Sequence, residues 1–511
     1  MKTYIKPYLF VWVLLTAGLA SCSDYFNPDQ DLGLKKEDHW DTHEEVRRSI
    51  IGAYSRLQPL VEELVVMGSL RGDLLTVTEN YDPYLNEINR HGQLSTTNPY
   101  ADPRGFYEVI KQCNEVLGNM EKAKADPKFT EEIHEIYKAE VISLRAWVYY
   151  QLAMTYKEIP VVTDPLSGYD KNYAPERYDF EQTVNWLIKE MEVAAATLSP
   201  NWATFSEEFN LWDLIFINRK ALLAELHLWA GNNERAATLL MEAVKEGEYF
   251  CNRNTSGGSN WTEFWNSNYS ALSEKVTIIP FNAYDNQKNG FGKLFSFGAS
   301  GDYLLRPTVK AIQDWQDDDR TSLDYRGYNR SYTFGPANQI LVYKYFRSKD
   351  TENGVVRQDE ELETDAPYCI YRAADLHLLY AEALNRAGRH REALRTVNER
   401  MEGVNESSGI RGRLHLSPIN LLEFAGIDES DRIDSLGIIS DVILAERAKE
   451  LAFEGRRWNA LMRFAVQASD PAVLADRVAT KFEGSEADRV RTYLMNRDNW
   501  RLDFDFDKLD K

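Results

Sequence analysis

Residues 220–231 read Lys-Ala-Leu-Leu-Ala-Glu-Leu-His-Leu-Trp-Ala-Gly and have the pattern of an amphipathic helix. Ala221, Ala224, Leu228 and Gly231 recur at the spacing of a single helix face. Small residues on that face let a second helix approach closely, and the glycine permits the left-handed turn that ends the helix. The stretch therefore predicts the first helix of an antiparallel pair.

A second copy of this pattern occupies residues 372–388 and reads Arg-Ala-Ala-Asp-Leu-His-Leu-Leu-Tyr-Ala-Glu-Ala-Leu-Asn-Arg-Ala-Gly. Both copies end in Ala-Gly followed five residues later by another alanine, Ala236 and Ala393. Residues 139–156 and 44–57 predict two further helices with the same periodicity. These units resemble the helix-turn-helix of tetratricopeptide repeats, although long insertions separate them.

Two long segments, 71–104 and 252–346, lack helical periodicity and are rich in Gly, Asn, Asp, Tyr and Trp. Within the second, residues 276–281 and 339–345 predict short strands. Irregular insertions on a rigid frame are where binding residues concentrate. The expected fold is mainly α: a scaffold of tetratricopeptide-type helix pairs that carries a long irregular, ligand-binding region and few short strands.

The N-terminus has the features of an export signal. Lys2 and Lys6 precede an apolar stretch over residues 8–19, which is too short to span a bilayer as a helix. The ending Leu-Ala-Ser-Cys22 resembles the bacterial lipobox, in which the cysteine receives a diacylglycerol and becomes the mature N-terminus. We expect a signal peptide over 1–21 and a lipidated polar leader over 22–43, with an ordinary secretory signal as the alternative.

Composition excludes several classes of protein. The formal charge of −21 repels phosphate backbones and makes nucleic acid a poor partner. Besides Cys22, the widely separated Cys113, Cys251 and Cys369 form no disulfide framework or zinc motif, and we expect buried free thiols.

Several motifs, in order along the chain, resemble the SusD/RagB family of surface lipoproteins. The matching residues are Gly52-Ala-Tyr54, Tyr107 to Asn114, Leu144-Arg145-Ala146, the Pro160 step, Phe281, Asp319-Arg320, and Tyr371 through Leu384. The most specific match is Glu446-Arg-x2-Glu450-Leu-x-Phe453-Glu-Gly-x-Arg457-Trp458. The C-terminus from Asn499 to Lys511 departs from the family pattern and puts contacts of that segment in doubt.

The Glu446–Trp458 motif has a structural interpretation. Arg447 with Glu450 and Glu454 with Arg457 have the i,i+3 spacing of ion pairs on a helix. The apolar positions between them predict a single packed helix face, which comprises Leu444, Ala448, Leu451, Ala452 and Gly455. We therefore expect packing and salt bridges here, and no glutamate-based catalysis.

The resemblance implies one SusD-like domain over 44–511. Its expected parts are an N-terminal helical part (44–250) with a binding-loop insertion (71–104), an irregular region (251–370) and a C-terminal helical part (371–511). It also implies a function: a non-enzymatic, outer-membrane lipoprotein that faces the exterior, binds oligosaccharide and delivers it to a TonB-dependent, SusC-like transporter. Peptide capture, as in RagB-like members, and a repeat scaffold that binds only a protein partner are the alternatives.

Catalytic and metal motifs are incomplete. His39 and His43 are spaced i,i+4, but no third ligand is indicated, and no nucleophile elbow or full phosphate loop occurs. We expect no catalytic residue, metal or cofactor.

Ligand contacts are expected where apolar rings lie among hydrogen-bonding side chains, because sugar rings offer both kinds of surface. The first stretch provides Arg71, Asp73, Asn80, Tyr81, Tyr84, Asn98 and Tyr100. The second provides Tyr284 and Phe291. Trp261 and Trp265 lie beside the second stretch, and core packing is the favoured interpretation for both.

Overall fold

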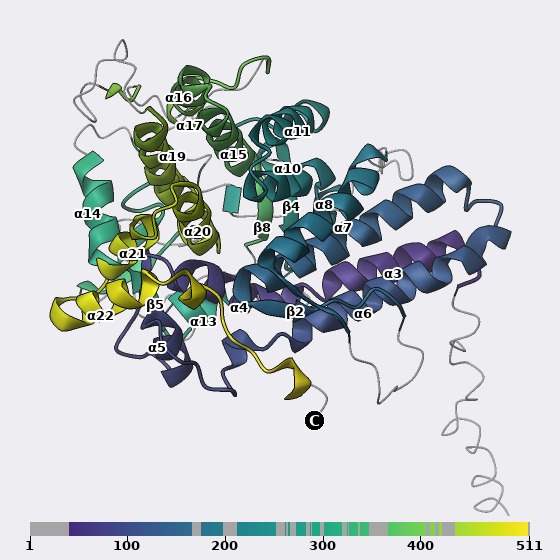
Figure 1. Cartoon of the computed structure of the whole chain (residues 1–511), viewed down its shortest axis with the longest axis horizontal. Helices are drawn as coiled ribbons and strands as arrows, with labels where there is room; N and C mark the ends of the chain where they lie inside the picture. Colours follow the sequence, from purple (N-terminus) through teal and green to yellow (C-terminus); the bar gives the residue numbers. More distant parts are fainter. Residues whose placement is uncertain are drawn as a thin grey trace, which may run out of the picture.

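The computed structural model is built mainly of helices (Figure 1). It describes residues 40–165, 175–197, 212–251, 272–282, 289–296, 301–318, 326–335, 338–346, 366–404, 409–413, 418–421 and 435–508, with Trp261, Phe264, Trp265, Gln287 and Asp324. Cys22, His39 and the Asp319-Arg320 pair lie outside the described residues.

The N-terminal part is built on long helices. Its helices are α3 (His43–Ser55), α4 (Val61–Val65), α5 (Pro83–Asn89), α6 (Arg104–Asn119), α7 (Glu131–Thr155), α8 (Phe180–Ala196) and α9 (Trp212–Ile215). The side chain of Thr42 caps α3, and Thr130 caps α7, where the hydroxyl accepts from the Ile133 N–H. The predicted helices over 44–57 and 139–156 are confirmed, and the second begins eight residues earlier than expected.

Both predicted helix pairs are confirmed. The first pair is α10 (Arg219–Trp229) with α11 (Asn233–Glu246), and the second is α15 (Ala373–Arg386) with α16 (His390–Asn398). The turns use Gly231 at φ 77° and Gly388 at φ 80°, in the left-handed region that glycine adopts without a steric penalty. The two pairs pack against each other through α11 and α15 (Figure 1).

The remaining helices follow the irregular region. They are α13 (Phe291–Phe295), α14 (Val309–Asp318), α17 (Ile410–Arg413), α19 (Ser435–Glu450), α20 (Arg457–Gln467), α21 (Ala472–Ala479) and α22 (Gly484–Leu494). The single helix predicted across the Glu446–Trp458 motif is wrong: α19 ends at Glu450 and α20 begins at Arg457. The turn between them has Phe453 at φ 68° and Gly455 at φ 72°, which a continuous helix does not allow.

Four two-stranded antiparallel sheets are present among the described residues. They pair β1 (Leu75–Val77) with β5 (Leu305–Pro307), β2 (Glu158–Pro160) with β3 (Arg177–Asp179), β4 (Lys275–Ile279) with β8 (Tyr368–Arg372), and β6 (Tyr332–Phe334) with β7 (Ile340–Val342). The predicted strands near 276–281 and 339–345 are therefore confirmed as β4 and β7.

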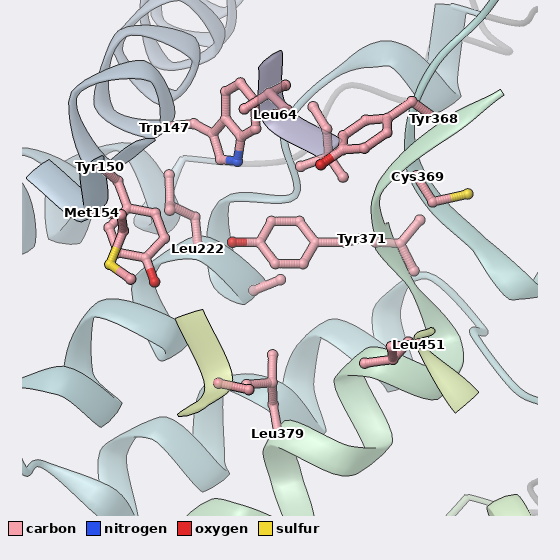
Figure 2. Packing of buried hydrophobic residues seen from close by; sticks show 14 of the residues in the cluster. Leu64, Trp147, Tyr150, Met154, Leu222, Tyr368, Cys369, Tyr371, Leu379 and Leu451 are labelled. Atoms are coloured by element: carbon pink, nitrogen blue, oxygen red, sulfur yellow. The ribbon is translucent and has the colours of Figure 1, made fainter. Parts of the chain in front are cut away.

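The core lies where helices of both halves meet β8. Figure 2 shows Trp147 and Tyr150 of α7, Leu222 of α10, and Tyr371 of β8 around one buried region. The Tyr371 hydroxyl donates to the Glu225 carboxylate over 2.9 Å, which satisfies this buried polar atom. Cys113, Cys251 and Cys369 are buried thiols, as expected. Trp261 and Trp265 are also buried, which confirms core packing for both.

The charges of the Glu446–Trp458 motif form buried ion pairs, but not the pairs that the spacing predicted. Arg447 donates to Asp375 over 2.8 Å, and Arg457 donates to both oxygens of Asp73. The Glu450 and Glu454 carboxylates both accept from Arg372. Because the helix stops at Glu450, these side chains project toward other segments and join them to the motif.

The C-terminal segment packs back onto the N-terminal half, although its sequence had put such contacts in doubt. The Leu502 N–H donates to the Thr155 carbonyl over 2.7 Å, and the Lys157 N–H donates to the Leu502 carbonyl over 3.0 Å. Trp500 is buried beside them. None of the described helices is long and apolar enough to cross a membrane.

Candidate ligand-binding site

The pairing of β1 with β5 brings the two irregular segments of the chain together. Just beyond β1, the Thr78 N–H donates to the Leu304 carbonyl over 3.0 Å, and the Thr78 hydroxyl donates to the Tyr303 carbonyl over 2.5 Å. The Asn80 side chain reaches the Asp302 carbonyl over 3.5 Å. The two segments in which we expected ligand contacts therefore form one surface region.

Three of the predicted residues lie at this surface. Asn80 is exposed, and the Tyr81 side chain is 45% exposed immediately before α5. Tyr84 is half-buried in the first turn of α5, and its hydroxyl lies 3.3 Å from the Thr97 hydroxyl. Asp82 starts this helix by accepting from the Leu85 N–H over 2.7 Å. This stretch thus provides an amide and two tyrosine rings that are at least partly exposed, which are the kinds of group that bind sugar rings.

Tyr328 and Phe334 extend the same region and were missed by sequence reasoning. Tyr328 is 42% exposed, and its ring lies 5.7 Å from that of Phe334 on β6. The Tyr303 hydroxyl donates to the Ile340 carbonyl of β7, the strand that pairs with β6. We call Asn80, Tyr81, Tyr84, Tyr328 and Phe334 the loop face. The excess of tyrosine around residue 328 was the one signal available in the sequence.

Two predicted contacts, Arg71 and Phe291, lie in the core rather than on the loop face. Phe291 has no exposed surface and stacks on Tyr345 with the ring centroids 4.1 Å apart. Arg71 is 3% exposed, stacks over Trp458 and donates to the Trp500 carbonyl. Neither side chain presents a surface to a ligand approaching from outside, so both interpretations are corrected.

Asp73, Asn98 and Tyr100 have structural partners. Both Asp73 oxygens accept from Arg457, and although burial opposes it, this guanidinium lowers the pKa of Asp73. The Asn98 side chain is buried and donates to the Tyr84 carbonyl over 3.0 Å, which supports the helix that carries Tyr84.

The Tyr100 hydroxyl donates to Glu62 over 3.0 Å, and Lys293 lies over its ring. Burial, followed by the charges of Glu62 and Asp82, raises the pKa of this phenol. Tyr100 therefore links α4 to α13 beneath the surface. Tyr284, the remaining predicted contact, lies outside the described residues.

Metal-ligating side chains gather at one place in the part of the chain that the structure describes. Glu131, His134 and Glu135 bring ligand atoms near one another in the first turn of α7. The His134 ring lies 2.8 Å from Glu121, and Lys124 pairs with both Glu121 and Glu131. His43, the residue with possible metal spacing in the sequence, pairs with Asp126 over 2.7 Å. These histidines thus already have carboxylate partners.

Comparison with known proteins supports the architecture over most of the chain. Residues 275–503 match the model of the SusD family, and residues 66–212 match a model described as starch-binding associating with outer membrane. SusD-like protein P38 of Formosa agariphila is 23% identical over 91% of this chain and 92% of its own length. SusD-like protein P2 of the same organism is also 23% identical, over 90% of this chain and 91% of its own length.

Solved structures show the same fold. A SusD superfamily protein of Bacteroides vulgatus matches with a TM-score of 0.66 at 16% identity, covering 89% of this chain and 93% of that one. A protein described as a laminarin-binding SusD-like protein matches with a TM-score of 0.60 at 18% identity, and the match covers 88% of this chain and 96% of that protein. With two family models matched in order, full-length relatives and this shared fold, the chain belongs to the SusD/RagB family.

Proposed function

We propose that this protein is a nutrient-binding lipoprotein of the outer membrane that captures an oligosaccharide on the loop face. The observation that carries the proposal is the convergence of two irregular segments, one of which carries Asn80, Tyr81 and Tyr84 and the other the exposed Tyr328. Membership of the family supports a binding role. The matched starch-binding description and the laminarin-binding neighbour support carbohydrate as the ligand class.

The proposed cellular arrangement follows from the N-terminus and the family. Residues 1–21 are removed, Cys22 is lipidated, and residues 44–511 form one domain that faces the exterior and passes its ligand to a SusC-like, TonB-dependent transporter. Two acyl chains give stable attachment without a spanning helix. Metabolic labelling with palmitate tests the anchor: label should enter the wild type, and its persistence in a Cys22→Ala variant would contradict lipidation at this position.

Isothermal titration against a panel of oligosaccharides tests the binding role. Tyr81→Ala and Tyr328→Ala should each weaken binding about fivefold, because a stacked ring contributes about 1 kcal/mol. Val193→Ala is the matched control, since Val193 is 70% exposed on α8, outside the loop face, and its loss should leave the affinity unchanged. Unchanged affinity in both tyrosine variants would overturn the assignment of the loop face.

Two other outcomes identify the alternative functions. If no glycan binds and a peptide library yields ligands that depend on Tyr81, the protein is a peptide-capturing member of the family. If neither class binds and only the transporter co-purifies with the protein, the helical repeats act as a scaffold for a protein partner. If the helices dock the transporter and the loops bind the ligand, Tyr81→Ala should weaken ligand binding about fivefold and leave co-purification with the transporter unchanged.

A further inference from the structure

Arg71 is a buried cation without a carboxylate partner. Its guanidinium lies 4.1 Å from the centre of the Trp458 ring and donates one hydrogen bond, over 2.5 Å, to the Trp500 carbonyl. No other hydrogen-bond or ion-pair partner for this guanidinium is found in the described parts of the chain. An arginine has several N–H donors, and the aromatic face compensates only part of its charge. The remaining donors are therefore available to an acceptor in an adjoining cavity.

Two small cavities adjoin this side chain. The first lies between the turn after α4, α7 and the start of α20, and is lined by Glu63, Arg71, Gln151, Thr155, Trp458 and Asn459 among others. The second lies under the C-terminal segment, with Arg71, Glu87, His91, Leu94, Tyr493 and Asn499 in its lining. Arg71 and Met67 are common to both. Both cavities are small, so an occupant must be small.

The unpartnered polar atoms of these linings include ring nitrogens. His91 lines the second cavity and Trp458 the first, and His91 Nε2 and Trp458 Nε1 are both buried without a hydrogen-bond partner. The Trp458 nitrogen is a donor only. The Tyr156 hydroxyl, nearby on the polypeptide that carries Thr155, is also buried and unpartnered. Such groups are costly to bury unless an acceptor reaches them.

The local field is positive. Burial lowers the pKa of Arg71, and the positive charge of Arg501 lowers it further. Burial also lowers the pKa of His91, followed by the charges of Lys481 and Arg71. The Lys481 ammonium donates to the Leu70 carbonyl and to Asn89 rather than to a carboxylate.

Two carboxyl groups border the cavities without cancelling this field. Burial, followed by the charge of Asp102, raises the pKa of Glu63 well above its usual value, which disfavours the charged form of this carboxyl group. Glu87 is half-buried, and its two oxygens already accept from Ser95 and Asn98.

We propose that Arg71 is the centre of an internal binding site for a small monovalent anion, of the size of chloride or a single carboxylate group. The anion accepts hydrogen bonds from the free edge of the guanidinium and compensates its charge between the turn after α4 and the C-terminal segment at Trp500. The site is separate from the loop face and does not depend on the proposed function.

Anion titration of the purified full-length mature protein tests the site. Chloride represents a halide ion taken from the medium, and formate represents a small free carboxylate. Ionic strength is held constant with a bulky sulfonate buffer that is too large for either cavity. One of the two anions should raise the thermal unfolding midpoint in a saturable manner, and the anion with the lower half-saturation concentration identifies the source. The absence of a saturable response to both would overturn the proposal.

Two variants test whether the anion-dependent rise in the unfolding midpoint comes from Arg71. Arg71→Met keeps the contact with Trp458 and removes the charge, so the half-saturation concentration should rise at least about tenfold. Arg235→Gln is the control, because Arg235 is an exposed α11 residue paired with Glu192, and its response should match the wild type. A wild-type response in Arg71→Met would refute the site.

Crystallography of the wild type provides a test that does not depend on the folding of Arg71→Met. After a bromide soak, an anomalous peak should appear within hydrogen-bond distance of the Arg71 guanidinium. Bromide sites elsewhere with none at Arg71 would refute the proposal.

Discussion

Replacing Glu382 with glutamine should lower the free energy of unfolding by about 3 kcal/mol at pH 7. Glu382 is 1% exposed on α15 and accepts from Arg463 of α20 over 2.8 and 2.9 Å. Burial alone would raise its pKa, but the charges of Arg386 and Arg463 lower the pKa to about 2, from an ordinary value of 4.5. This depression corresponds to about 3 kcal/mol. Loss of one partner of a buried ion pair typically costs about 3–5 kcal/mol, which agrees.

The sign of the pH dependence follows from the lowered pKa. The contribution of Glu382 is complete above the unfolded pKa and is lost as pH falls toward 2, because the unfolded chain binds the proton first. The difference between wild type and Glu382→Gln should therefore shrink to about 1.4 kcal/mol at pH 3. Urea unfolding followed by circular dichroism at both pH values measures it. Glu392→Gln, at a half-exposed pair with Arg389, is the control and should cost less than about 1 kcal/mol. A loss below 1 kcal/mol at pH 7, or one that does not change at pH 3, would refute the reasoning.

Burial raises the pKa of the Cys113 thiol to about 12, so above pH 9 the unfolded chain loses a proton that the folded chain retains. Stability should fall by about 1.4 kcal/mol per pH unit more in the wild type than in Cys113→Ala between pH 9 and 12, as urea titrations at each pH would show. Gly388→Ala should cost about 1 kcal/mol, because φ is 80° with open space around the added carbon. Gly52→Ala, inside α3 and also in open space, should instead stabilise by about 0.5–1 kcal/mol; equal effects in thermal melts would contradict this contrast. Gly68→Ala should destabilise far more than Gly388→Ala, because its added carbon would lie 2.0 Å from the Gly455 carbonyl oxygen; soluble expression with an unchanged melting temperature would argue against this close approach.

Sequence periodicity predicted the helix pairs because their determinants are local. The Ala-Gly turns at Gly231 and Gly388 depend on residues within a few positions of each other, and the structure confirms both. The Glu446–Trp458 motif was harder, since i,i+3 spacing has meaning only within a continuous helix. The left-handed residues Phe453 and Gly455 end that continuity, so its charges pair with distant segments.

The candidate site was predictable as a region more than as a set of residues. Tyr81 and Tyr100 have similar polar neighbours in the sequence, yet one is 45% and the other 5% exposed. The difference arises from Glu62 and Lys293, which reach Tyr100 from other segments and hold it beneath the surface. The pairing of β1 with β5 also joins residues far apart in the chain, and no local pattern specifies that partner.

Hydrogen exchange on the wild-type protein, with and without a bound oligosaccharide, tests the central claim most directly. Ligand should slow amide exchange at residues 78–84 and 328–334, on both of the segments that form the loop face. Protection confined to the helical pairs α10–α11 and α15–α16, with none at the loop face, would contradict the account.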